Sequence, residues 1–145
     1  MYLDSAYIAK FYVNEVDSRA VRNRIRAADT LVSSEWAIAE VSCVLHRHVR
    51  EGSLKPSHIR ELLDAFEEHV EKGVWRLMPV TRSRLERIAS LVRAAPQSLF
   101  LRAGDAIHLV CALESGEREI WTNDRHLLAA AAHFGLVART VGPAI

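Results

Sequence analysis

The stretch EIWTNDRHLLAAAAHFGLVARTV, residues 119–141, decides the fold because it contains a strand, a helix and a second strand in that order. Residues 119–122 predict a short strand, and residues 125–134 predict a helix that ends at Gly135. Residues 137–141 predict the second strand. Strands joined by a helix lie parallel in one sheet, whereas an antiparallel pair needs only a tight turn.

The same alternation of strands and helices runs through the rest of the chain. Strands are predicted at residues 1–4, 30–33 and 74–80. The helices predicted between the strands are marked by these residues: Ala9 and Tyr12; Ala20, Val21 and Ile25; Trp36 to Leu45; Pro56 to Lys72; Thr81 to Val92; and Ala103 to Ser115. No repeat or linker interrupts the pattern. We therefore expect one domain over residues 1–145, an α/β fold with a short, mainly parallel sheet flanked by helices.

The composition limits the class of protein. Half of the 145 residues are apolar and 26% are charged, as in ordinary globular proteins. No uncharged apolar run reaches the roughly 18 residues that a membrane helix needs, and the first residues do not resemble a signal peptide. Cys43 and Cys111 lie in apolar helical patterns, which predicts small buried side chains rather than a disulfide or a metal site. We expect a cytoplasmic protein that does not contact membranes.

Arginines gather in two segments, although the net charge is only +1. The clusters are Arg19, Arg22 and Arg26, and then Arg82, Arg84, Arg87 and Arg93. Arginine side chains suit phosphate groups. The simpler interpretation, which these residues alone favour, is a solvated helix surface with local ion pairs.

Three carboxylates lie at the borders between predicted elements. Asp4 and Asp124 follow strands and precede helices, where an aspartate commonly caps the helix. Asp105 falls in the first turn of its helix, where the helix dipole favours a negative charge. Each of the three is explained structurally when it is considered alone.

Glu40 is harder to explain in structural terms. Its neighbours one helical turn away are apolar, which places the carboxylate on a largely buried helix face: Trp36, Ala37, Cys43 and Val44. A buried carboxylate needs a partner charge or a cation, and no arginine or lysine occupies those positions. Glu35 lies at the exposed start of the same helix and is interpreted as a solvated acid.

The carboxyl ends of parallel strands form one edge of a sheet, where α/β proteins bind their ligands. Asp4, Glu40, Asp105 and Asp124 can converge at that edge. Clustered carboxylates repel one another unless divalent cations compensate, and all-oxygen ligation suits Mg²⁺ or Mn²⁺ rather than zinc. Such metals are typical of phosphodiester cleavage.

Four blocks of the sequence resemble, in order and spacing, the motifs of PIN-domain ribonucleases, and most of all the VapC toxins of type II toxin–antitoxin pairs. The blocks are YLDS at 2–5, SSEWAIAEV at 33–41, LRAGDAIH at 101–108 and TNDRHL at 122–127. Each block contains one of the four acids. The resemblance implies a three-layer PIN-like α/β fold and an endoribonuclease that cuts single-stranded or looped RNA with Mg²⁺ or Mn²⁺.

The resemblance also implies roles for individual residues. Asp4 and Asp105 would be the principal metal ligands, and Glu40 and Asp124 would complete the set directly or through water. Ser5 and Thr122 would support the acids by hydroxyl hydrogen bonds.

The histidines are treated separately from the metal ligands. His108 follows Asp105 by one helical turn, and a packed or hydrogen-bonded histidine is favoured over a general base. His46 and His48 face different ways on a helix and are not assigned to a metal.

A VapC toxin has partners, which the resemblance carries over as expectations. These are an RNA substrate, a small VapB-like antitoxin that binds DNA, and a second copy of the chain in a homodimer. The apolar stripe from Ile59 to Val70, together with Tyr12, is interpreted as core, with antitoxin or dimer contact as a hypothesis.

Two alternatives stay open. A housekeeping RNA-processing PIN nuclease shares the same motifs, although the absence of an added RNA-binding module favours the toxin. A Mg²⁺-binding regulatory domain of the receiver type needs an acid pair near the first strand and a late lysine. Ser5 and Ala6 follow Asp4, and no lysine follows Lys72, so the sequence disfavours that alternative.

Overall fold

The computed structural model describes residues 1–142 and has a five-stranded sheet in the order β3-β2-β1-β4-β5. The strands are β1 (Tyr2–Leu3), β2 (Val32–Ser34), β3 (Arg76–Met78), β4 (Glu119–Trp121) and β5 (Val137–Arg139). Every pairing between neighbours is parallel. The prediction of a mainly parallel sheet is confirmed, and within the described residues the sheet is wholly parallel.

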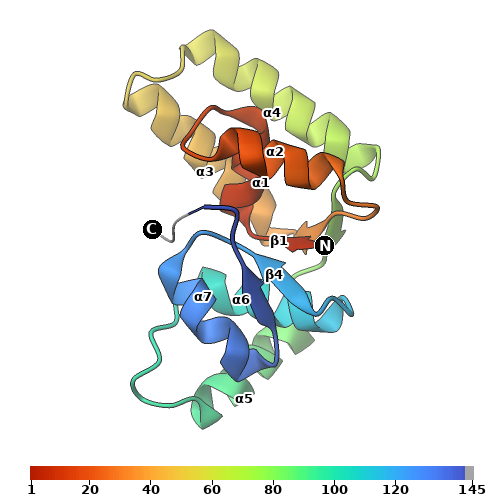
Figure 1. Ribbon diagram of the computed structural model, residues 1–145, viewed down its shortest axis with the longest axis vertical. Coiled ribbons are helices and arrows are strands. Elements are labelled where there is room, and N and C mark those ends of the chain that lie inside the picture. The colour runs from red at the N-terminus through yellow and green to blue at the C-terminus, as the bar shows by residue number, and fades with distance from the viewer. Residues whose placement is uncertain (143–145) are drawn as a thin grey trace.

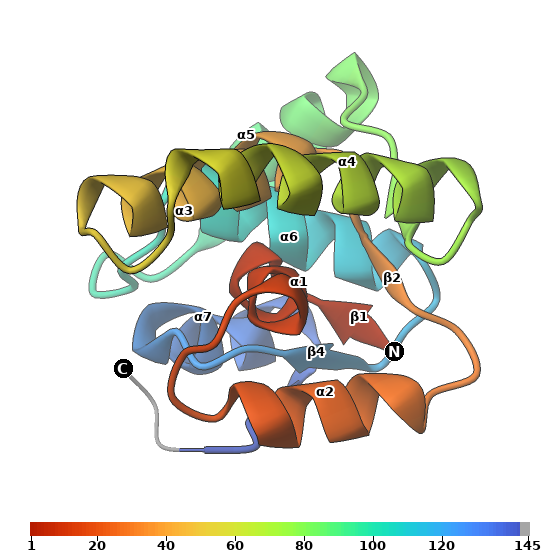
Figure 2. The ribbon, with the colours of Figure 1, turned by 90° about the horizontal axis from the view of Figure 1, so that it is seen from above.

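Helices cover both faces of the sheet, so the molecule has three layers (Figure 1). The helices are α1 (Ser5–Tyr12), α2 (Ser18–Arg26), α3 (Trp36–Arg50), α4 (Pro56–Glu71), α5 (Arg82–Ala94), α6 (Ala103–Glu114) and α7 (Arg125–Ala131), followed by the 3₁₀ turn η1 (Ala132–Phe134). Helices α1 to α4 lie on one side of the sheet and α5 to α7 on the other. Seen from above, α3 and α4 run side by side over α1 (Figure 2).

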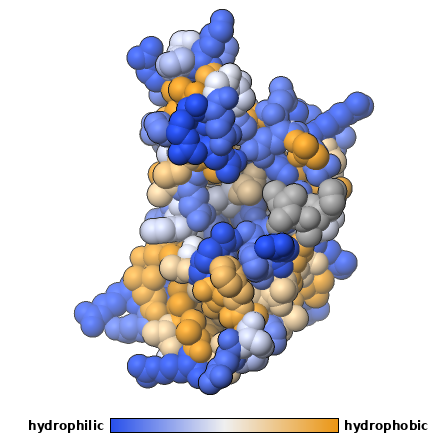
Figure 3. Space-filling model, turned by 90° about the vertical axis from the view of Figure 1, so that its left-hand side faces the viewer, coloured by the Kyte–Doolittle hydropathy of each residue, from blue (hydrophilic) through white to orange (hydrophobic). Residues whose placement is uncertain are grey.

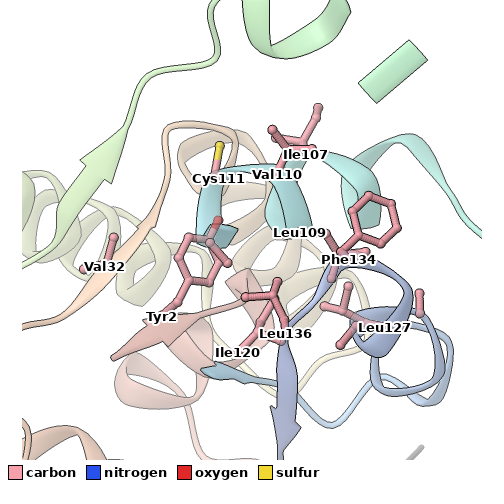
Figure 4. Close-up of a cluster of buried hydrophobic side chains, with 13 residues drawn as sticks. Tyr2, Val32, Ile107, Leu109, Val110, Cys111, Ile120, Leu127, Phe134 and Leu136 are labelled. Atoms are coloured by element: carbon pink, nitrogen blue, oxygen red, sulfur yellow. The ribbon is translucent and has the colours of Figure 1, made fainter. Parts of the chain in front are cut away.

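Two hydrophobic cores, one on each side of the sheet, hold the layers together. Successive side chains of a strand point to opposite faces, and in β1 they enter different cores. Tyr2 belongs to the same core as Leu109 and Phe134 of the lower layer, α5 to α7 with η1 (Figure 4), whereas Leu3 belongs to the core of the upper layer, α1 to α4. The central strand therefore joins both cores through only two residues.

The apolar stripe of α4 faces inward. Phe66 is fully buried, and Ile59, Leu62 and Val70 are partly buried against the upper core. Its interpretation as core is confirmed. Within residues 1–142 no helix is long and apolar enough to cross a membrane.

The prediction that both cysteines are buried is confirmed for one of them and wrong for the other. Cys111 is buried and free, as predicted, but Cys43 is exposed. The prediction for Cys43 was wrong because its side of α3 borders a pocket instead of the core. A helical pattern of apolar residues cannot distinguish these two surroundings.

Ion pairs between α5 and α6 support the interpretation of the second arginine cluster as local pairing. Arg84 Nε lies 2.7 Å from one oxygen of Glu114, and Arg87 Nη1 lies 2.8 Å from the other. Burial raises the pKa of Glu114, but the hydrogen bonds and charges of the two arginines outweigh it, and the pKa falls below its ordinary 4.5.

We expect Glu114→Gln to lower the free energy of unfolding by about 1 kcal/mol near neutral pH. The lowered folded pKa means that the pairs stabilise the fold fully above about pH 4.5 and lose this contribution as the pH falls through the folded pKa. Urea denaturation at neutral and acidic pH measures the difference, which should vanish in acid. Glu86→Gln, which removes the exposed Arg82–Glu86 pair, is the control and should have little effect at either pH. A difference between wild type and Glu114→Gln that persists in acid would contradict the assignment.

Candidate active site

One pocket of about 510 Å³ lies at the carboxyl edge of the sheet, and all four predicted acids line it. Asp4 directly follows β1, and Asp124 lies three residues after the end of β4. Asp105 is in the first turn of α6, and Glu40 is in the second turn of α3. Strands β1 and β4 are neighbours at the centre of the sheet, which brings their ends together. The structure thus gathers four residues that are far apart in the sequence.

Asp4 combines a structural role with a place in the pocket. As the N-cap of α1, its Oδ1 accepts a hydrogen bond of 2.8 Å from the backbone N–H of Tyr7. Its Oδ2 accepts a hydrogen bond from the Thr122 hydroxyl. The residue is only 5% exposed, and this burial raises the pKa of the carboxyl group although both hydrogen bonds oppose the change. Among residues 1–142 no arginine or lysine pairs with it.

Glu40 has partners that its helical neighbours could not reveal. Its Oε2 accepts a 2.5 Å hydrogen bond from the Ser5 hydroxyl and lies 2.9 Å from Nε2 of His108. Nδ1 of His108 lies 3.0 Å from the Tyr2 hydroxyl, which completes a chain from the core to the pocket. Burial raises the pKa of Glu40, but His108, Ser5 and Trp36 together outweigh it and lower the pKa.

The sequence argument placed Glu40 on a largely buried helix face, and this is wrong for two of its four apolar neighbours. Its helix face is a pocket wall, on which Trp36 and Cys43 are exposed. Its partner His108 comes from α6, which is remote in the sequence. The hydrogen-bonded interpretation of His108 and the supporting role of the Ser5 hydroxyl are both consistent with these contacts.

Arg102 links the other two acids. Its Nε lies 2.9 Å from Oδ2 of Asp105, and its Nη2 contacts both Oδ1 of Asp105, at 3.3 Å, and Oδ2 of Asp124. Asp124 also caps α7 through Oδ1, which accepts from the backbone N–H groups of His126 and Leu127. Burial raises the pKa of Asp124, but these N–H groups and Arg102 outweigh it and lower the pKa.

Sequence reasoning assigned no role to Arg102. Its position three residues before Asp105 was a usable signal, since residues three apart at a helix start lie close together. Its contact with Asp124 had no such signal, because it depends on the packing of α6 beside α7.

Gly104 allows α6 to approach α3 closely. A Cβ atom at this position would lie 2.8 Å from Oε1 of Glu40 and 3.3 Å from Nε1 of Trp36. Any larger residue would therefore displace the carboxylate of Glu40. This glycine is needed for space, and its backbone is ordinary helix.

The ligand atoms that the pocket offers are of the type that a hard divalent cation prefers. Four carboxylates provide only oxygen ligands, as Mg²⁺ and Mn²⁺ prefer, and Asp4 is a buried carboxylate without an arginine or lysine partner. In the described part of the chain, however, no three acid, histidine or cysteine side chains are close enough together to hold a metal ion. Two of the acids are instead held by Arg102.

The fold and the pocket define an α/β protein with four carboxylates in one pocket at the carboxyl edge of a parallel sheet. The sequence profile of the PIN domain matches residues 1–133, so the chain belongs to the PIN domain family. This family has a nuclease-type fold, and its members are generally metal-dependent nucleases. A comparison with curated proteins gives no significant match.

Proposed function

We propose that this protein is an endoribonuclease that uses Mg²⁺ or Mn²⁺ to hydrolyse phosphodiester bonds in unpaired RNA. The observation that carries the proposal is the convergence of Asp4, Glu40, Asp105 and Asp124 on one pocket of a PIN-family fold. The order and sequence surroundings of the four acids resemble those of the acids in the PIN family motifs.

In this proposal Asp4 and Asp105 are the principal metal ligands, and Glu40 and Asp124 complete the set. The metal, when bound, lowers the pKa of a water molecule and neutralises negative charge on the phosphate. The chain's own contribution is orientation. Tyr7 N–H and Thr122 hold the Asp4 carboxylate, while Ser5 and His108 hold Oε2 of Glu40.

Aromatic side chains around the pocket favour an unpaired substrate. Trp36 lines the pocket and is partly exposed. Phe100 is exposed, and its ring packs against that of His126 with 4.1 Å between the ring centroids. His126 lies two residues after Asp124 in the sequence. Exposed aromatic rings stack on the bases of single strands and loops, whereas paired bases are already stacked. Arg47 also lines the pocket and suits the phosphate backbone.

We further propose that the nuclease is the toxin of a type II toxin–antitoxin pair, similar to VapC, and acts in the cytoplasm as a homodimer. Its partner would be a small VapB-like, DNA-binding antitoxin. The support is the order of the four sequence blocks and the presence of exposed apolar residues that a partner could cover, such as Val16 and Ile38. One side of the molecule shows a broad apolar area over its lower half (Figure 3).

The test of the nuclease proposal is cleavage of defined RNAs by the purified protein. A single strand, a hairpin with a loop and a fully paired duplex are each incubated with Mg²⁺, with Mn²⁺ and with EDTA. We expect cuts in the strand and the loop, none in the duplex, and none with EDTA. Cleavage that survives EDTA would refute the metal mechanism.

The toxin role is tested separately in cells. Expression of the chain alone should arrest growth, and the arrest should be relieved by a co-expressed small protein that co-purifies with it. Normal growth despite active nuclease in the lysate would favour a housekeeping RNA-processing enzyme.

A further inference from the structure

We propose that Arg102 is an internal cation that competes with the divalent metal for Asp105 and Asp124, so that metal binding and release of Arg102 form one coupled step. The inference rests on the metal site of the proposed function and goes beyond it by assigning a role to a residue outside the ligand set.

The first observation is that one guanidinium group serves both acids. Nε and Nη2 of Arg102 contact the two oxygens of Asp105 in a two-point arrangement, and Nη2 also contacts Oδ2 of Asp124. This is the geometry in which arginine binds carboxylates most specifically. The positive charge therefore lies between two of the proposed metal ligands.

The second observation is that each carboxylate oxygen of the two acids already accepts a hydrogen bond. Both oxygens of Asp105 are occupied by Arg102. Oδ1 of Asp124 accepts from the N–H groups of α7, and its Oδ2 accepts from Arg102. Asp105 and Asp124 would hold a metal ion through oxygens that the guanidinium now contacts. The two cations also repel each other at such short range, so they cannot share the position.

The third observation is that the Arg102 side chain is much more exposed than the acid it contacts. Its side chain is 54% exposed, while that of Asp105 is only 13% exposed. Arg102 precedes α6 with an extended backbone, and its own N–H still contacts Oδ2 of Asp105 at 3.3 Å. The side chain can therefore rotate towards solvent while α6 and its acid stay in place.

This arrangement gives Arg102 a use in each state. Without metal, it neutralises two carboxylates that would otherwise repel each other. After displacement, it remains on a residue that lines the pocket, where a guanidinium can bind a phosphate of the RNA.

The experiment is a calorimetric titration of the full chain with Mn²⁺, without RNA. Arg102→Ala should bind Mn²⁺ about tenfold more tightly than wild type, because a competing pair of exposed ionic contacts is gone. Arg102→Lys keeps the charge but loses the fork, and its affinity should fall between the two. The matched control is Arg139→Ala, since the Arg139 side chain is 52% exposed and pairs with Glu119 outside the pocket. Its affinity should equal that of wild type.

Equal or weaker Mn²⁺ binding by Arg102→Ala would overturn the inference and leave the proposed nuclease function standing. Failure of wild type and variants alike to bind Mn²⁺ would overturn both. If Arg102→Ala does not fold, Arg102→Lys is compared with wild type. Tighter Mn²⁺ binding by Arg102→Lys would then support the inference, and equal or weaker binding would overturn it. Thermal unfolding with and without Mn²⁺ provides an independent readout, because a tighter-binding variant gains more in melting temperature.

Discussion

Replacing Asp4 by Asn is expected to reduce RNA cleavage by about 10³-fold while leaving the fold intact. The substitution removes the negative charge from the most buried of the four acids. An amide oxygen can still accept the hydrogen bond from the Tyr7 N–H, so the cap of α1 survives. Burial raises the pKa of Asp4, which means that its charge destabilises the metal-free fold. The variant should therefore melt at the same temperature as wild type or higher.

Two measurements check this prediction. Cleavage rates on a single-stranded RNA give the loss of activity, and thermal unfolding with and without Mn²⁺ gives the loss of metal binding. Mn²⁺ should raise the melting temperature of wild type more than that of Asp4→Asn. Asp64→Asn, which alters an exposed acid on α4, is the control and should behave as wild type. Equal stabilisation of wild type and Asp4→Asn by Mn²⁺ would mean that Asp4 is only a helix cap.

Gly104→Ala is expected to lower cleavage by about 10²-fold with little change in stability. The new methyl group would lie 2.8 Å from Oε1 of Glu40, so the carboxylate must move. That movement is inexpensive for the fold, because the displaced atom ends a flexible side chain. Alanine also favours the helix over glycine by about 1 kcal/mol, which offsets part of the strain. The expected result is a folded protein with a misplaced acid.

A double-mutant cycle with Glu40→Gln separates this explanation from a general disturbance of α6. If Gly104→Ala acts through Glu40, it should have almost no further effect on cleavage in the Glu40→Gln background. Full additivity of the two losses would place the damage elsewhere. Circular dichroism and urea denaturation of each variant confirm that the fold is retained.

Local patterns were enough to predict the elements of this fold, while their arrangement required the structure. Each strand was predicted close to its observed place, but β3 covers only Arg76–Met78 of the predicted residues 74–80. Trp75 precedes the strand, and its side chain is buried in the upper core. The helix predicted over residues 125–134 changes into a 3₁₀ turn before Gly135, which adopts a left-handed conformation. The order of the strands could not be read from the sequence, because local patterns do not specify which strands are neighbours.

The same limit applies to the candidate site. Asp4 and Asp124 were predicted because strand ends and helix caps are local features. The partnership of Glu40 with His108 and that of Arg102 with Asp124 depend on packing between helices that are distant in the sequence. Cys43 shows the converse error, in which an apolar neighbourhood suggested burial and the structure shows a pocket wall.

The central strand, whose two residues enter different cores, also governs when the site can exist during synthesis. Glu40 is carried by the upper layer, whereas Asp105 and Asp124 are carried by the lower one. A growing chain that has folded only its first half holds Asp4 and Glu40 without their counterparts. The ribosome-bound protein therefore has no complete set of acids until β4 has emerged and docked beside β1. Any activity that needs all four acids is therefore absent until most of the chain has been made.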